Sequence, residues 1–537
     1  MSSGAKPTGR HIVDPADGPA DAPVYDRGTL GAGDHSEGPA AVTQLDAATL
    51  VRPGWTVTLQ PDGALLPTDA NEKVRMMLEA LPLPSAGLSA VFDHISAHRD
   101  DFLRRVMDYV RHPSISAHNV GITEVAALLV RMLTEIGLEA ETVPTAGHPM
   151  VLGRWEKKPG APTILLYGHY DVQPPDPLEL WLSPPFEPTI RDGRIFARGI
   201  GDNKGQHFAQ LMAIESHLKV HGELPCNVIF LLEGEEEIGS PRIADFVAAN
   251  RERLKADFVV TADGPMHPSG TPTMKYGVRG MVSFELRVKH AIRDVHSGNL
   301  GGVVPNPIWT LVHLLSTMKT PAGEITIDGL HDAIVPPDEL DLAAIKRLPL
   351  DLDEAKAALG LSRLDAPAAR GYYERLMFHP TLTVNGFHGG YGGPGSKTVL
   401  PSEAFVKCDI RLVEAMTPDD VLAKVAAHVK THAPEVEFIP RGGMLPSRVP
   451  MDSPYGAIIR SAIELAQGVS PLEYPCAGGS LPDYVFTKIL GVPAFEVPYA
   501  NADEANHAPN ENMKIDCFHN GIRTGAALLD RVGASKG

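Results

Sequence analysis

The chain has 537 residues, of which 43% are hydrophobic and 21% are charged, so it is neither a fibrous nor a wholly disordered protein. Its length suggests about two to four domains. The net charge of -18 argues against a broad phosphate-binding surface, and hence against a nucleic-acid partner.

The first 89 residues differ in amino-acid composition from the rest of the chain. Residues 1–40 contain seven glycines and five prolines but few large apolar side chains. Such a segment cannot bury enough surface to offset the entropy lost on ordering, so we expect a disordered arm, with a docking tail as the alternative. Residues 41–89 form an N-terminal extension of mixed composition, in which residues 71–81 are a candidate short helix.

Strands and helices alternate in residues 90–277. Short apolar strands are predicted at 163–167, 227–232 and 257–261, and a helix is predicted at 206–221. Ser240 followed by Pro241 suits the start of a further helix, with serine as its N-cap and proline at its first position. This alternation predicts an α/β fold with a mostly parallel sheet that is covered on both faces.

The pattern changes at about residue 278. Residues 281–289 and 405–412 alternate between apolar and polar side chains, which is typical of antiparallel strands with one solvated face. After residue 446 a helix near 457–466 and a short strand at 494–497 resemble the earlier half. We therefore expect an α+β domain at 278–446 inserted between two parts of an α/β domain, 90–277 and 447–537.

The cysteines and the lengths of the apolar runs indicate the cellular compartment of the protein. Cys226, Cys408, Cys476 and Cys517 are far apart and form no CxxC pair, which indicates reduced thiols rather than a disulfide framework or a zinc knuckle. No run of about 18 apolar residues could span a membrane. The N-terminus also lacks the apolar core of a secretory signal. We expect a cytoplasmic protein with no membrane partner.

Acidic and histidine side chains follow each predicted strand of the first α/β part. His169 and Asp171 follow the first strand, residues 235–237 are three glutamates after the second, and Asp263 follows the third. Ligands bind beyond the carboxyl ends of strands in such sheets. Carboxylates converging there would repel one another unless cations lay among them, and an imidazole with oxygen donors suits Zn²⁺, Mn²⁺ or Co²⁺.

Each of these motifs alone has an ordinary alternative. The His169 segment could be a polar loop at a strand end, and the glutamates at 235–237 could be a solvated charge cluster. Residues 202–205 could be a turn with a helix cap. Their joint occurrence at successive strand ends favours a metal site over these alternatives.

Eight motifs resemble the signature of the M20 metallopeptidases, the carboxypeptidase G2/carnosinase-like family, and occur in that family's order. They cover roughly residues 90–537, and the first 90 residues lie outside the resemblance. The motifs are GHYDVQP (168–174), GIGDNKG (199–205), EGEEEIGS (233–240), RDVHSGN (293–299), TVLP (398–401), DIRLVE (409–414), GGSLP (478–482) and NHAPNE (506–511).

The resemblance implies a centre of two divalent metal ions, with zinc expected and manganese or cobalt as alternatives. Asp202 would bridge the two ions. His169 and Asp263 would hold one ion, and Glu237 and His507 would hold the other. The family's signature also implies that the peptide bond after the bridging aspartate is cis.

The resemblance further implies the catalytic groups. Glu236 would be the general base and Asp171 would orient His169. The family's pair of adjacent glutamates before x-Gly-Ser falls on Glu236 and Glu237. Glu235 then occupies a variable position, and a slip of one residue would make it the base instead.

Substrate contacts can be carried over in the same way. Arg411 resembles an arginine that binds a free carboxylate through its bidentate fork, and Ser480 resembles part of a cradle for the same group. His296 and Thr398 resemble residues that reach in from the lid of a partner subunit, with His296 polarising the scissile carbonyl. On spacing alone, Arg411 could equally be a surface arginine and His296 a turn residue.

These inferences together predict a metal-dependent hydrolase that cleaves the amide bond of dipeptides or short peptides. The inserted segment is long for the family and is closer to carnosinase-type dipeptidases. The alternatives are an N-acyl-amino-acid amidohydrolase of the same fold and a non-catalytic metal- or peptide-binding member. A homodimer formed through the lid is expected. The preferred side chains of the substrate and the role of residues 1–89 do not follow from the sequence.

Overall fold

The computed structural model describes residues 84–358, 360–364 and 371–535, together with seven strands in the segment before residue 84. The chain divides into two units, Met1–Leu83 and Pro84–Gly537.

The first unit contains two small sheets, one in the order β1-β2-β4-β5 and one in the order β3-β6-β7. Strands β1, β2 and β3 lie within residues 1–40, so the expectation of a disordered arm is wrong for these strands. The glycine and proline content does not reveal the short segments between these residues. Some of those segments contain β-branched and aromatic residues, which favour strands. The candidate helix at 71–81 lies outside the described residues. The strands are β1 Gly9–Val13, β2 Ala20–Asp26, β3 His35–Glu37, β4 Ala40–Gln44, β5 Ala47–Val51, β6 Trp55–Leu59 and β7 Leu65–Asp69.

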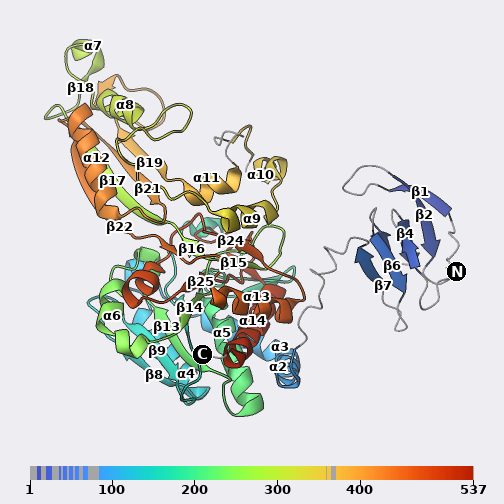
Figure 1. Cartoon of the computed structure of the whole chain (residues 1–537). Helices are drawn as coiled ribbons and strands as arrows, with labels where there is room; N and C mark the ends of the chain where they lie inside the picture. Colours follow the sequence, from blue (N-terminus) through green and yellow to red (C-terminus); the bar gives the residue numbers. More distant parts are fainter. Residues whose placement is uncertain are drawn as a thin grey trace. The chain divides into compact units, whose positions relative to one another are not determined.

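The second unit is built around an eight-stranded sheet in the order β24-β15-β25-β14-β10-β13-β9-β8 (Figure 1). At its centre β10 pairs in parallel with β13 and β14, and β14 pairs in parallel with β25. The predicted mostly parallel α/β fold is confirmed. The strands are β8 Glu139–Val143, β9 Met150–Trp155, β10 Thr163–His169, β13 Asn227–Glu233, β14 Phe258–Thr261, β15 Thr273–Lys275, β24 Leu472–Tyr474 and β25 Ala494–Glu496.

Helices cover both faces of this sheet. Along β13, Val228 and Phe230 join the larger core cluster on one face, and Ile229 and Leu231 join a smaller cluster on the other. A strand buried on both sides explains why residues 228–232 are apolar without alternation. The larger cluster includes residues of α2 Ala86–Ala97, α3 Arg99–Val110, α4 Ile122–Glu135, α5 Lys204–His221, α13 Pro454–Gln467 and α14 Ile515–Ala534; the smaller includes residues of α6 Ile243–Ala249 and the π-helix η6 Val485–Leu490.

The helix expected to start at Ser240 starts later. Helix α6 begins at Ile243, and Ser240 has a φ of 53°, which is not the conformation of an N-cap. Its hydroxyl donates a hydrogen bond to Glu233 Oε2, 3.2 Å away. The Ser240 hydroxyl therefore binds the buried carboxylate of Glu233 instead of capping the helix.

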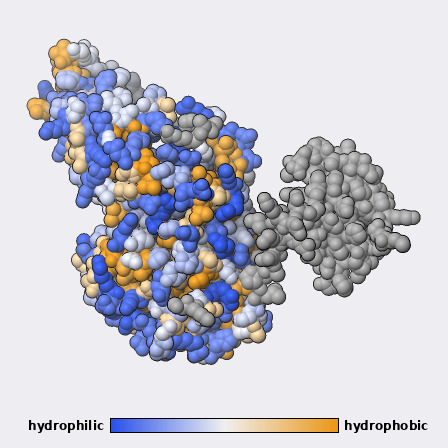
Figure 2. Space-filling model, viewed as in Figure 1, coloured by the Kyte–Doolittle hydropathy of each residue, from blue (hydrophilic) through white to orange (hydrophobic). Residues whose placement is uncertain are grey.

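The inserted lid has its own core. Four antiparallel strands in the order β19-β21-β17-β22 pack against α8 and α12, and apolar side chains such as Phe284 and Val406 fill the space between them. The lid extends away from the main sheet, with β18 and α7 at its far end (Figure 1), and the space-filling view from the same side shows this projection (Figure 2). It is attached where β16 pairs with β23. Its elements are β16 Gly277–Val278, β17 Gly280–Lys289, β18 Val295–His296, α7 Ser297–Leu300, α8 Pro307–Met318, α9 Glu339–Arg347, α10 Leu352–Ala358, α11 Tyr372–Phe378, β19 Thr381–Gly389, β20 Val399–Leu400, β21 Glu403–Leu412, α12 Pro418–His432, β22 Glu437–Met444 and β23 Ser447–Arg448.

Candidate metal centre

Acidic and histidine side chains gather at the carboxyl edge of the main sheet. His169 ends β10, Glu236 and Glu237 open a short 3-10 helix after β13, and Asp263 follows β14. Because β10, β13 and β14 are parallel neighbours, their carboxyl ends lie at one edge. Asp202 reaches the same edge from the loop that precedes α5.

The carboxylate of Asp202 lies between two groups of donor atoms. Its Oδ1 is 3.0 Å from His169 Nε2, and that nitrogen is 3.5 Å from Asp263 Oδ2. Its Oδ2 is 3.1 Å from His507 Nε2, which is 3.0 Å from Glu237 Oε2. Each oxygen of one carboxylate therefore faces a histidine nitrogen and a second carboxylate. The Asp202–Asn203 peptide bond is cis, as expected.

The chemistry of this donor set fits divalent cations. Ligand atoms of His169, Asp202 and Glu237 lie within 4.8 Å of one another. His169, Asp202 and Asp263 are buried, and buried carboxylates require cationic partners or hydrogen bonds. Imidazole nitrogen together with carboxylate oxygen suits zinc and its neighbours among the transition metals.

Asp171 supports both halves of the site through its backbone and its side chain. Its carboxylate accepts hydrogen bonds from the backbone N–H groups of Glu236 (3.2 Å) and Glu237 (3.1 Å). His169 Nδ1 lies 3.0 Å from the Asp171 carbonyl oxygen and 3.4 Å from its carboxylate. The nearest partner of His169 Nδ1 is thus the Asp171 backbone, while the Asp171 side chain holds the two glutamates.

Hydrogen bonding raises the pKa values of the histidines, and burial raises those of the glutamates. Burial lowers the pKa of His169, but hydrogen bonds with Asp171, Asp202 and Asp263 outweigh it and raise that pKa well above the usual value. Hydrogen bonds to Asp202 and Glu237 raise the pKa of His507 to about 10. Burial raises the pKa of Glu237 to about 7 and that of Glu236 well above the usual range. Protons held in this way occupy positions that a cation would take over.

Two positioning side chains were not singled out from the sequence. The buried Glu511 accepts hydrogen bonds from the backbone N–H groups of Gly199 (2.9 Å), Gly201 (2.9 Å) and Asp202 (3.0 Å), and from Arg198 (2.6 Å). It therefore fixes the loop that carries Asp202. Glu511 ends the NHAPNE motif, which is the only signal in the sequence that could have identified it.

Asn203 is the second positioning side chain. Its Oδ1 accepts from the backbone N–H of His169, 3.1 Å away, and its Nδ2 donates to the carbonyl oxygen of Ala262, 2.5 Å away. One amide therefore ties the end of β10 to the end of β14, next to Asp202. From the sequence, Asn203 was considered only as part of a turn or helix cap.

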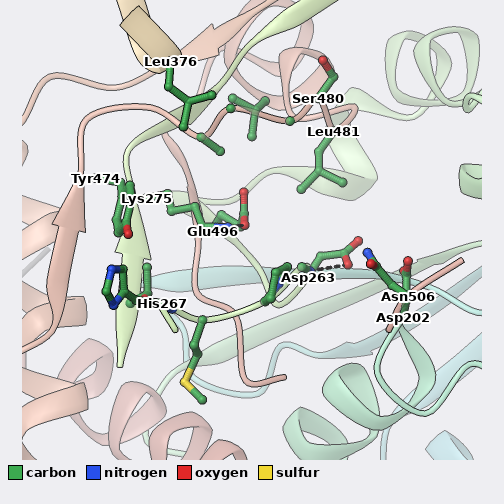
Figure 3. Close-up of a pocket in the computed structure, with 18 of the residues that line it drawn as sticks. Asp202, Asp263, His267, Lys275, Leu376, Tyr474, Ser480, Leu481, Glu496 and Asn506 are labelled. Carbon is green, nitrogen blue, oxygen red and sulfur yellow. Dashed lines mark hydrogen bonds and ion pairs between the residues drawn. The ribbon is translucent and has the colours of Figure 1, made fainter. Parts of the chain in front are cut away.

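A cavity of about 560 Å³ opens beside these groups (Figure 3). Its lining includes Asp202, Glu236, Asp263 and His507, and also Arg411 of β21 in the lid. The guanidinium of Arg411 donates to Ser480 Oγ, 2.7 Å away, and Ser480 belongs to the α/β part of the chain that follows the lid. The structure thus brings Arg411 and Ser480 to the same cavity as the donor cluster.

His296 and Thr398 lie elsewhere in the single chain. His296 Nε2 is 3.2 Å from Thr398 Oγ1, across the short β18–β20 pair. His296 is exposed, and neither residue is among the described residues that line the cavity. Within one chain these two side chains are therefore together but apart from the metal-binding groups.

A comparison with known protein families identifies the family of this chain. The model of peptidase family M20/M25/M40 matches residues 165–531, which is more than half of the chain. The chain belongs to this family. The M20 resemblance found in the sequence is confirmed, and the protein is a metallopeptidase.

Relatives of this M20 peptidase span most of its length. Cys-Gly metallodipeptidase dug1 of Schizosaccharomyces pombe is 29% identical over 459 residues, which cover 81% of this chain and 96% of that one. Beta-Ala-His dipeptidase of Rattus norvegicus is 28% identical over 478 residues, covering 83% and 96%.

Solved structures share the lid-bearing fold of this M20 peptidase. An M20 family metallo-carboxypeptidase from Sulfolobus solfataricus superposes with a TM-score of 0.77 at 34% identity, covering 81% of this chain and 99% of that one. Human carnosine dipeptidase 1 gives a TM-score of 0.72 at 27% identity, covering 83% and 100%. Among the described residues, no helix has the length and apolarity needed to cross a membrane.

The role of Glu511 can be tested through metal affinity. Glu511→Gln places an amide NH₂ among the N–H groups of the Asp202 loop, so we expect the affinity for divalent metal to fall about 10- to 100-fold. Isothermal titration with zinc measures it. Glu215→Gln is the control, because Glu215 also pairs with an arginine, Arg105, but lies away from the cavity. Equal metal affinities in the two variants would contradict this role.

Proposed function

We propose that this M20 peptidase is a dipeptidase with two divalent ions, of which zinc is the expected native metal and manganese or cobalt the alternatives. The observation that carries the proposal is the position of Asp202, whose two oxygens face two separate groups of donors. His169 and Asp263 would hold one ion, Glu237 and His507 the other, and Asp202 would contribute to both.

Glu236 is the general base in this proposal. It is half-buried, lines the cavity, and its backbone is held by Asp171 next to the donor Glu237. Bound divalent ions supply Lewis acidity and lower the pKa of water in the site. Glu236 accepts the proton of the attacking water and delivers it to the nitrogen of the leaving amine. The raised pKa that burial gives Glu236 suits a group that must both take and return a proton.

Arg411 and Ser480 bind the carboxylate end of the substrate. The guanidinium provides a planar, bidentate fork, and Ser480 already fixes one of its nitrogens. Because Arg411 comes from the lid and Ser480 from the catalytic domain, a bound carboxylate would join the two domains across the cavity.

The assembly proposed is a homodimer formed through the lid, with the lid taken as residues 278–446. Exposed His296 and Thr398 lie together at the far end of that lid (Figure 1). In a symmetric dimer they would enter the partner's site. We also propose a cytoplasmic location, which the four unpaired cysteines support.

A substrate panel tests the proposed activity. The protein, freed of metal and reloaded with Zn²⁺, Mn²⁺ or Co²⁺, is assayed for amine release from unblocked dipeptides and from N-acetyl amino acids. We expect hydrolysis of the dipeptides that disappears on metal removal and returns on reloading. Faster hydrolysis of the N-acetyl amino acids would assign the deacylase activity instead. Metal binding with no hydrolysis of either class would indicate a non-catalytic binding protein.

A further inference from the structure

A buried ion pair forms part of the cavity wall away from the metal donors. Glu496 ends β25, and Lys275 ends β15 directly opposite it in the antiparallel register. The Lys275 ammonium contacts Glu496 Oε1, and both side chains line the cavity beside Asp263 (Figure 3). Beyond β14, the strands β25 and β15 therefore also end in polar residues. These residues line a part of the cavity that the proposed mechanism does not use.

The carboxylate of Glu496 has unused hydrogen-bonding capacity. Glu496 is only 2% exposed, and among the described residues the hydrogen bond and ion pair that it makes, both with Lys275, involve Oε1 and not Oε2. Buried carboxylate oxygens normally have partners, because an unpaired one costs desolvation free energy. A ligand in the cavity is the available partner for this oxygen.

The charge of the surroundings favours a cation as that partner. Lys275 pairs with one oxygen of Glu496, whereas the carboxylate of Asp263 adds negative charge beside it. Asp483 accepts a hydrogen bond from Thr261, the β14 neighbour of Glu496 in the sheet. Lys275 pairs with one oxygen of Glu496 and so orients the other oxygen. The carboxylates in this region still outnumber the ammonium group of Lys275.

The Lys275–Glu496 pair also lies close enough to the metal donors to reach the α-amino nitrogen of a bound dipeptide. The α-amino nitrogen of a dipeptide is two bonds from the scissile carbonyl carbon, about 2.5 Å away. Its binding group must therefore lie next to the metal donors. Gly264 directly follows Asp263, and a Cβ added to Gly264 would be 3.3 Å from Glu496 Oε1 and 3.6 Å from Lys275 Nζ. The pair thus borders the residue adjacent to a metal donor.

We propose that Glu496, oriented by Lys275, binds the free ammonium group of the substrate. This inference rests on the proposed dipeptidase function and adds the selection of the substrate's amino end. Arg411 and Ser480 hold the carboxylate of the substrate, and Glu496 holds its ammonium group. An acylated nitrogen lacks the charge and cannot make this ion pair, so the pair selects unblocked dipeptides over N-acyl amino acids.

The test compares two substrates that differ only in the amino group, alanylglycine and propionylglycine. In Glu496→Gln we expect kcat/KM for alanylglycine to fall about 10- to 100-fold, because one charge-assisted hydrogen bond is lost. For propionylglycine, kcat/KM should stay within about twofold of wild type. Where propionylglycine is turned over too slowly, its Ki as a competitive inhibitor of alanylglycine hydrolysis gives the same comparison.

Asp483→Asn is the matched control. It removes a buried carboxyl group from the same neighbourhood, but Asp483 does not line the cavity. This variant should keep the wild-type preference between the two substrates, and thermal melting shows whether each variant is folded. A preference for alanylglycine that survives in folded Glu496→Gln, or equal losses on both substrates, would overturn the inference. Wild-type protein that hydrolyses no dipeptide would instead refute the proposed function itself.

Discussion

Glu236→Gln is expected to lower kcat by about 10²- to 10⁴-fold, the usual contribution of a positioned general base. Glutamine has almost the same shape as glutamate but cannot accept the proton of water. Glu236 is not among the residues assigned to hold metal, so the variant should still bind two equivalents of metal. Steady-state kinetics at saturating metal, with metal content measured on the same samples, checks both expectations.

Glu235→Gln is the matched control for this variant. Glu235 is buried one residue away, and its Oε1 accepts a hydrogen bond from the backbone of His148 at 3.1 Å, outside the cavity. Its kcat should therefore remain near the wild-type value. The opposite result, with Glu235→Gln inactive and Glu236→Gln active, would show that the glutamate run is displaced by one residue from the family's pattern.

Two inactive chains are expected to restore activity when they are mixed. If His296 of each lid acts in the partner's site, a hybrid dimer of His296→Ala and Glu236→Gln chains contains one site with both residues intact. Free exchange of subunits gives half of the dimers as hybrids, each with one of its two sites active. The mixture should therefore reach about a quarter of wild-type activity for an isologous dimer.

Subunit exchange must be verified separately, for example with two differently labelled chains. Each variant assayed alone provides the baseline for the mixture. No recovery of activity despite complete exchange would mean that His296 does not act across a subunit interface. In that case the contact between His296 and Thr398 would be a feature of the lid alone.

Much of the main sheet could be predicted because its signals are local. The apolar runs at 163–167 and 227–232 form β10 and β13, and each is followed at once by the expected His169 or glutamates. Parallel pairing then places these strand ends together without further information. The helix expected at 206–221 is α5, which begins two residues earlier, at Lys204.

The remaining features depend on contacts between distant parts of the chain. Glu511 holds the loop before Asp202 from about 310 positions away, and no spacing rule connects the two. Lys275 and Glu496 meet only because β25 enters the sheet beside β15. Ser240 is a different case, because its partner Glu233 is close in sequence, but that this hydroxyl binds a buried carboxylate instead of capping a helix does not follow from spacing.

The place of β25 in the sheet has a consequence for synthesis of the chain. This strand lies between β14 and β15, although the ribosome makes it only after the whole lid. Until then β14 has an unpaired edge, which is a site for chaperones or for aggregation of the nascent chain. His507 and Glu511 emerge later still. Neither the sheet nor the donor set around Asp202 is complete until the residues that follow the lid have been translated.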